Sequence, residues 1–113
     1  MNTMDDMDNV LEVLIKVFFK ASNIALTNTI DSTLHNQLKD NINKLENHVE
    51  TIDNLSMLIS DEELDNETNH IKINILLLFI LSLRLIKQLA EEETKTYVMI
   101  CNLCISKIIN APE

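Results

Sequence analysis

The sequence contains no glycine, no tryptophan and a single proline, Pro112, close to the C-terminus. Glycine supplies the positive φ angles of tight hairpins and lets the backbone approach a phosphate closely. Its absence excludes the standard glycine-rich loops of P-loop NTPases, dinucleotide-binding domains and kinases, and the nucleophile elbow of α/β-hydrolases. Because no proline interrupts the chain before position 112, long continuous helices are the natural expectation.

Basic residues are scarce as well. The nine Lys and Arg residues stand against eighteen Asp and Glu residues, which gives a formal net charge of −9. Because these cations are scattered singly, the sequence offers no clustered basic patch for a phosphate backbone, and we expect no direct nucleic-acid binding. An acidic chain of this kind suits a basic surface on another protein instead.

The N-terminal segment and the cysteines indicate an intracellular protein. Residues 1–9 read MNTMDDMDN, which is acidic where a secretory signal is basic. Cys101 and Cys104 are too close in sequence to link distant parts of the chain, which favours a reducing compartment. We therefore expect a cytoplasmic location. The frequent Ile, Asn and Lys residues are compatible with AT-rich coding in a virus, a phage or a low-GC bacterium, and for a virus the location would be the host cytoplasm.

Apolar residues recur at helical spacing in four segments, approximately residues 5–26, 30–59, 69–90 and 92–110. The first opens with acidic residues that suit a helix N-terminus, and Asp31 or Ser32 can cap the second. The second has one narrow apolar stripe that begins at Ile30, and its wide polar face is typical of an outer helix. If this helix continued unbroken to Ile59, it would be roughly 40 Å long.

The third segment contains the most apolar run of the chain, INILLLFILSLRLI at residues 73–86. Its uninterrupted part, residues 75–81, is far shorter than the roughly 20 residues that a membrane-spanning helix requires. We therefore expect a helix at the centre of the fold, covered by other helices and not by lipid. Membrane association of the chain is not expected.

No segment shows the alternating pattern of a β-strand, and no hairpin turn is present. The sequence predicts an all-α protein. We expect a single domain spanning residues 1–113 that folds as an up-and-down helical bundle of about four helices.

The first, third and fourth segments carry more apolar residues than a four-helix core of this length needs. Exposing the excess would favour aggregation. We therefore expect a symmetric homodimer that buries the outer apolar strips of these helices. The residues predicted for this interface are Val13, Phe18, Phe19, Leu83, Tyr97, Val98 and Ile105.

Cys101 and Cys104 have the C-x2-C spacing that forms half of many zinc or redox sites. Zinc needs four ligands, and no second cysteine pair is present. The pair also lies inside an apolar helical segment. Buried thiols that pack as small apolar groups are therefore the better interpretation.

Two further patterns carry part of a metal-binding signature. Glu67 and His70 have the Glu-x-x-His spacing of di-iron helical bundles, but the motif occurs only once. Residues 61–67 alternate acidic side chains as a calcium loop does, yet Asn66 stands where glycine is required and Lys72 where the bidentate glutamate belongs. We expect neither a metal ion nor a cofactor.

No combination of nucleophile, base and orienting group stands out, so we do not expect an enzyme. The leading hypothesis is a non-enzymatic protein–protein interaction or assembly module. In this hypothesis a small acidic helical bundle binds another protein through a helix face or groove.

Two alternatives stay open. The first is an acidic inhibitor or nucleic-acid mimic that occupies a basic site. The second is a bundle of the immunity-protein kind that acts at a membrane receptor, which is an analogy of fold alone. The acidic surface used by the first alternative would comprise Asp61, Glu62, Glu63, Asp65 and Glu67.

Overall fold

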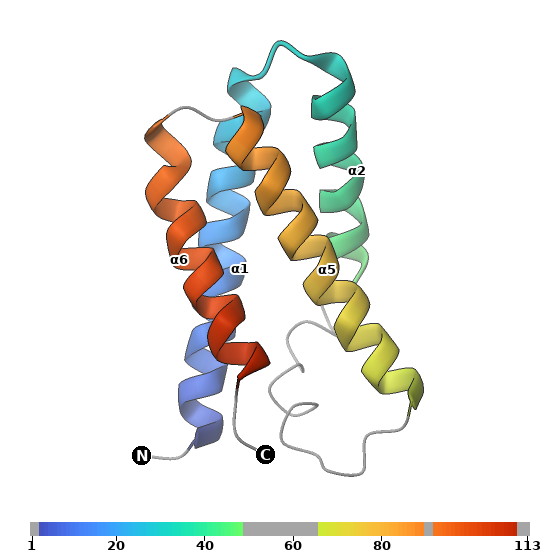
Figure 1. The fold of residues 1–113 in the computed structure, drawn as a ribbon, viewed down its shortest axis with the longest axis vertical. Helices are drawn as coiled ribbons and strands as arrows, with labels where there is room; N and C mark the ends of the chain where they lie inside the picture. The colour runs from blue at the N-terminus through green and yellow to red at the C-terminus, as the bar shows by residue number, and fades with distance from the viewer. Residues whose placement is uncertain (1–2, 49–65, 90–91, 111–113) are drawn as a thin grey trace.

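The computed structural model describes residues 3–48, 66–89 and 92–110. Across these residues the chain forms four α-helices and no strand. Figure 1 shows that successive helices run in alternating directions, up and down along the long axis. The prediction of an all-α helical bundle is therefore confirmed. The four helices are α1 (Thr3–Asn28), α2 (Ser32–Asn47), α5 (Asn66–Leu89) and α6 (Glu92–Ile109).

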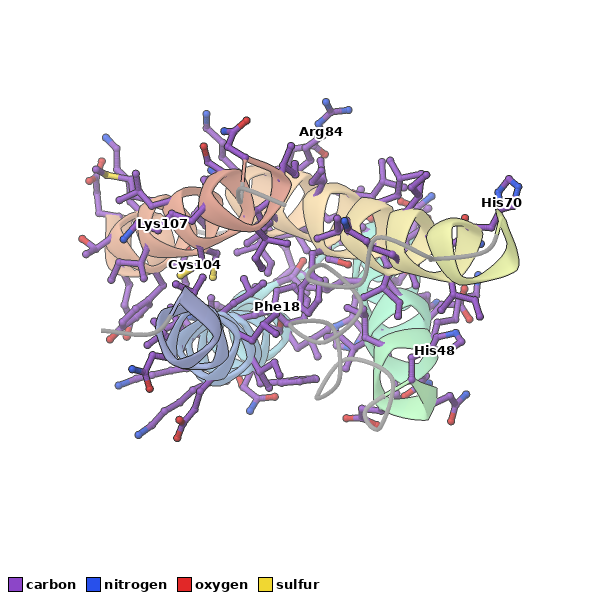
Figure 2. All side chains as sticks on the ribbon, turned by 90° about the horizontal axis from the view of Figure 1, so that it is seen from below. Phe18, His48, His70, Arg84, Cys104 and Lys107 are labelled. Carbon is purple, nitrogen blue, oxygen red and sulfur yellow. The ribbon has the colours of Figure 1, made fainter. Side chains whose placement is uncertain are left out.

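The helices are arranged in two layers. Seen from below in Figure 2, α5 and α6 form one layer, and α1 and α2 form the other. The most extensive contacts between the layers join α1 to α6 and α2 to α5, and α5 also contacts α1 and α6. Helices α1 and α5 each touch all three other helices, so the contacts do not single out α5 as the central helix.

Two phenylalanine side chains join the layers at the middle of the core. Phe18 of α1 and Phe79 of α5 are both fully buried, and their ring centroids lie 4.9 Å apart at an interplanar angle of 84°. Phe19 meets the ring of Phe18 edge to face as well, at 5.3 Å. Edge-to-face pairs of this kind place the positive ring edge against the negative ring face, which stabilises the contact beyond its apolar area.

The buried serines form hydrogen bonds within their own helices. Ser22 Oγ donates to the carbonyl oxygen of Phe18 at 2.8 Å, and Ser82 Oγ donates to that of Leu78 at 2.6 Å. An unpaired buried hydroxyl would cost free energy. Among the described residues no buried side-chain nitrogen or oxygen lacks a hydrogen-bond partner.

The start of α2 is fixed by a capping residue. Asp31 is extended, and its Oδ1 accepts hydrogen bonds from the backbone N–H groups of Thr33 at 3.0 Å and Leu34 at 3.2 Å. The predicted cap is thereby confirmed. Ile30 precedes this cap and is fully exposed, so the prediction that Ile30 begins the buried stripe of this helix is wrong.

Helix α2 ends earlier than its apolar spacing predicted. It closes at Asn47, and the N–H of His48 donates to the carbonyl oxygen of Leu45 at 3.0 Å, which tightens the last turn. An unbroken helix to Ile59 is therefore wrong, and residues 49–59 lie outside the described part of the chain. Within α2 the narrow buried stripe is present, formed by Leu38, Ile42 and Leu45.

The apolar run of α5 is covered on one side only. Ile75, Phe79 and Ile86 are buried, whereas Leu77 and Leu81 on the opposite side are 47% and 46% exposed. Among the described helices, none combines the length and the apolar character needed to cross a bilayer. The expectation that other helices cover this segment is therefore correct for its inner side only, because the bundle leaves its outer side exposed.

Replacing Phe79 by Ala should lower the free energy of unfolding by about 3–5 kcal/mol, because it removes the ring that fills the centre of the core. Urea unfolding followed by circular dichroism measures the change. The matched control is Leu81→Ala on the exposed side of the same helix, where the loss should stay below about 1 kcal/mol. Equal losses at both positions would contradict the described orientation of α5.

Replacing Asp31 by Ala should cost about 1 kcal/mol, since two N–H groups at the start of α2 would lose their acceptor. Asp31→Asn retains a capping oxygen and should restore most of the stability. Thermal unfolding of the three proteins under identical conditions tests this order. Equal thermal unfolding midpoints for all three proteins would show that the cap does not contribute to stability.

Candidate protein-binding surface

The residues predicted for an interface divide between the core and the surface. Phe18, Leu83, Val98 and Ile105 are buried within the single chain, so a partner could reach them only if the core opened. Val13 is exposed, and Phe19 and Tyr97 are partly buried against the core. Helical spacing identifies which residues share a face, but not which of two apolar faces turns inward. Self-association stays a prediction, and the exposed residues of the chain are where a partner could bind.

Tyr97 also has a partner inside the chain. The Nζ of Lys20 on α1 lies 5.2 Å from the centroid of the Tyr97 ring on α6. A cation over an aromatic ring is attracted by the negative ring face. This contact adds to the seam between α1 and α6 and occupies a face of the Tyr97 ring.

The predicted acidic surface falls mainly outside the described residues. Asp61, Glu62, Glu63 and Asp65 belong to that undescribed segment, and so does most of the calcium-loop pattern. Glu67 lies in the first turn of α5. The hypothesis of an acidic inhibitor therefore stays a prediction.

The uncovered side of α5 carries a regular apolar stripe. Ile73, Leu77 and Leu81 follow one another at steps of four residues and are each about half exposed, at 52%, 47% and 46%. His70 and Arg84 lie three residues beyond either end of this stripe, on the same side of the helix. Figure 2 shows both of these side chains pointing away from the layer of α1 and α2. The stripe between them therefore lies on the outside of the bundle.

Helix α6, which lies in the same layer as α5 (Figure 2), carries exposed apolar residues as well. Met99 and Leu103 are one helical turn apart and are 60% and 63% exposed. They lie opposite the buried side of α6, which includes Cys101 and Ile108 and packs against α1. We refer to Ile73, Leu77, Leu81, Met99 and Leu103 together as the outer face.

The sequence predicts outer apolar strips on the third and fourth segments, but none of the five residues of the outer face is among the residues predicted for the interface. The middle of α5 is apolar almost all round, which is typical of a helix buried on every side. In a two-layer bundle of this size only one side of such a helix is covered. A helix that has more apolar sides than neighbouring helices can cover therefore predicts an exposed apolar stripe.

Two recesses border the outer face. One of about 650 Å³ lies between the end of α5 and the first half of α6, and Met99 contributes to its lining. The other, of about 320 Å³, lies between α2 and α5, and Leu81 and Arg84 line it together with Asp40. Each recess contains a residue of the outer face, so apolar side chains of a partner could enter the surface at both places. The wall of the larger recess is completed by Lys87, Glu92, Thr94, Lys95, Val98 and Asn102.

The surroundings of the outer face are basic, although the chain as a whole is acidic. From His70 to the end of α5 at Leu89 the sequence has no Asp or Glu, but it has Lys72, Arg84 and Lys87. Helix α6 adds two exposed lysines, Lys95 and Lys107, and two exposed glutamates in its first turn, Glu92 and Glu93. On α5, Arg84 and Lys87 are exposed, whereas Lys72 is only partly exposed and lies on the other side of the helix from the stripe. The layer of α5 and α6 therefore presents more cations than carboxylates around the apolar stripe.

The two cysteines are buried on α6 and are not disulfide-bonded. Burial, with a smaller contribution from the neighbouring Cys104, raises the pKa of the Cys101 thiol to about 12. Burial also raises the pKa of Cys104, although Lys107 opposes that shift. Reactive thiols have a lowered pKa, so this pair acts as packing material.

The described residues contain no cluster of three or more His, Cys, Asp or Glu side chains that could hold a metal ion. His70 of the Glu-x-x-His pattern is exposed at the end of the outer stripe. Figure 2 places His48 on α2 and His70 on α5 in different layers, with their side chains pointing in different directions. His48 and His70 therefore do not belong to one site.

No protein-family model, curated protein or solved structure matches this chain significantly.

The buried thiols predict a loss of stability at high pH. An unfolded cysteine ionises near its ordinary pKa of 9.0, whereas folded Cys101 ionises at about 12. Folding therefore opposes ionisation of Cys101. The stability that the protonated thiol contributes is complete below pH 9 and is lost as the pH rises toward 12, by up to about 4 kcal/mol. The free energy of unfolding should therefore change less with pH across this range in Cys101→Ala than in the natural chain.

A labelling experiment tests the same thiols independently. At pH 8 a thiol-specific reagent should modify the folded protein slowly and the urea-unfolded protein at once. Fast labelling of the folded chain would contradict the burial of Cys101 and Cys104.

Proposed function

We propose that this protein is a non-enzymatic interaction or assembly module that binds another protein through its outer face. The observation that carries the proposal is the exposed stripe of Ile73, Leu77 and Leu81, continued on α6 by Met99 and Leu103. Scattered exposed apolar residues are normal on protein surfaces. A row of them at helical spacing, supported by a rigid core beneath, is typical of a surface that a partner covers.

The geometry is suited to recognition of a helix. Apolar anchors at steps of three or four residues bind a partner helix whose own apolar side chains recur at the same spacing. The recesses beside Leu81 and Met99 supply places where a few large side chains could be desolvated. Such desolvated anchors contribute most of the free energy of typical interfaces.

A homodimer is one form of this proposal, in which a second copy of the chain covers the exposed apolar residues. It follows from the surplus of apolar surface, because an uncovered stripe lowers solubility. Size-exclusion chromatography with light scattering measures the mass directly.

The test of the outer face is the double variant Leu77→Asn, Leu103→Asn. Both side chains are exposed, so the helical content should not change, whereas fluorescence of a bound apolar dye should fall several-fold. Co-purification from the native host should recover a specific partner with the natural chain and lose it with the double variant. If the natural chain dimerises through this face, the double variant should have the mass of a monomer.

The matched control is Ile30→Asn, which makes the same kind of change at a fully exposed residue between α1 and α2. This variant should bind dye and partner as the natural chain does. A double variant that retains the same dye fluorescence, mass and partners would refute a binding role for the outer face.

A further inference from the structure

Taking the proposed function as its premise, the charge pattern specifies the partner. We infer that the outer face binds an acidic amphipathic helix of another protein, with the apolar side of that helix on the stripe and its carboxylates at the basic edges. The inference rests on three features of the described residues, namely the spacing of the stripe, the cations around it and the recesses at its borders.

The stripe has the length of a short helical segment. From Ile73 to Leu81 it covers nine residues, whose eight steps of 1.5 Å give about 12 Å, and from His70 to Arg84 it covers about 21 Å. A partner helix of about four turns spans that distance. It would place a Leu, Ile or Met on the stripe at every turn.

Cations stand where the polar flanks of such a helix would lie. Arg84 points outward at one end of the stripe in Figure 2. Lys87 and Lys95 line the larger recess beside Met99, and Lys107 is exposed further along α6. Two carboxylates, Glu92 and Glu93, are exposed in the first turn of α6, and Glu92 lies 3.9 Å from Lys95 and partly neutralises it. Carboxylates on the partner would be attracted by the remaining positive charge.

A second copy of the chain fits these charges less well. In a symmetric contact of one α5 with another, residues 70–89 would meet only neutral or basic side chains, because this stretch has no Asp or Glu. Like charges brought together in an interface oppose association. An acidic partner removes this repulsion and supplies ion pairs in its place.

An anionic membrane shares the chemistry of an acidic helix but differs in extent. A helix is about 10–12 Å wide and senses the charges along one strip. A membrane is a plane that faces the whole molecule, which carries a net charge of −9. Electrostatic forces persist over a Debye length of about 8 Å at physiological salt, so the acidic parts of the chain would oppose a membrane more than a narrow helix.

The test uses two capped, fluorescein-labelled peptides of eighteen residues. Both carry leucine at helical spacing on one side, and the other side is rich in glutamate in one peptide and in lysine in the other. Fluorescence anisotropy should show the glutamate peptide binding at least tenfold more tightly than the lysine peptide at low salt. The difference should shrink as the salt concentration rises, because screening weakens the ion pairs.

Charge reversal identifies the residues responsible. Arg84→Glu should weaken binding of the glutamate peptide about tenfold and strengthen binding of the lysine peptide. The control Lys39→Glu makes the same change of charge at an exposed residue of α2 and should leave both affinities within about twofold. Leu77→Asn should weaken binding of either peptide, because both need the apolar stripe. Circular dichroism confirms that each variant is folded.

Other outcomes overturn the inference. If the two peptides bound with equal affinity and Leu77→Asn abolished binding of both, the outer face would remain a binding surface. It would then have no preference for an acidic partner. If the protein floated with phosphatidylserine vesicles, the outer face would be assigned to lipid. If the protein formed a dimer that excluded the peptides and that Arg84→Glu stabilised, the face would be assigned to a second copy of the chain. If neither peptide bound and the Leu77→Asn, Leu103→Asn variant kept full dye fluorescence, both this inference and the proposed function would fall.

Discussion

The contact between Phe18 and Phe79 is the constraint on which the rest of this bundle depends. The two rings lie at the centre of the core and connect the layer of α1 and α2 with the layer of α5 and α6. Because α5 has Phe79 turned inward, Leu77 and Leu81 must turn outward, since a helix rotates about 100° per residue. One aromatic contact thus decides which apolar residues of α5 are buried and which face a partner.

The same constraint separates the stability of the molecule from its recognition surface. The buried side of α5 is shared with three neighbouring helices, whereas its exposed side contributes little to the core. Substitutions on the outer face can therefore change binding with a small effect on folding. The exposed basic residues of α5 lie outside the core as well. The layer of α5 and α6 therefore has a positive net charge, whereas the net charge of the whole chain is negative.

The helical fold could be predicted from the sequence because its determinants are local. The cap at Asp31, the narrow stripe of Leu38 and Leu45 and the lack of glycine act within a few residues of one another. The interface residues could not be predicted in the same way. Phe18 and Val13 both belong to apolar patterns on α1, and only packing against α5 and α6 shows that Phe18 is interior. The end of α2 at Asn47 was missed because apolar residues recur at helical spacing in the sequence beyond it.

The buried serines have a consequence for the substitutions that the core tolerates. Ser22 and Ser82 each return their hydroxyl to the preceding turn of the same helix. Neither bond crosses to the facing helix, and the edge-to-face contact of Phe18 with Phe79 supplies a directional link between α1 and α5 instead. Because both hydroxyls are satisfied locally, a substitution on the facing helix would leave neither serine with an unpaired buried hydroxyl.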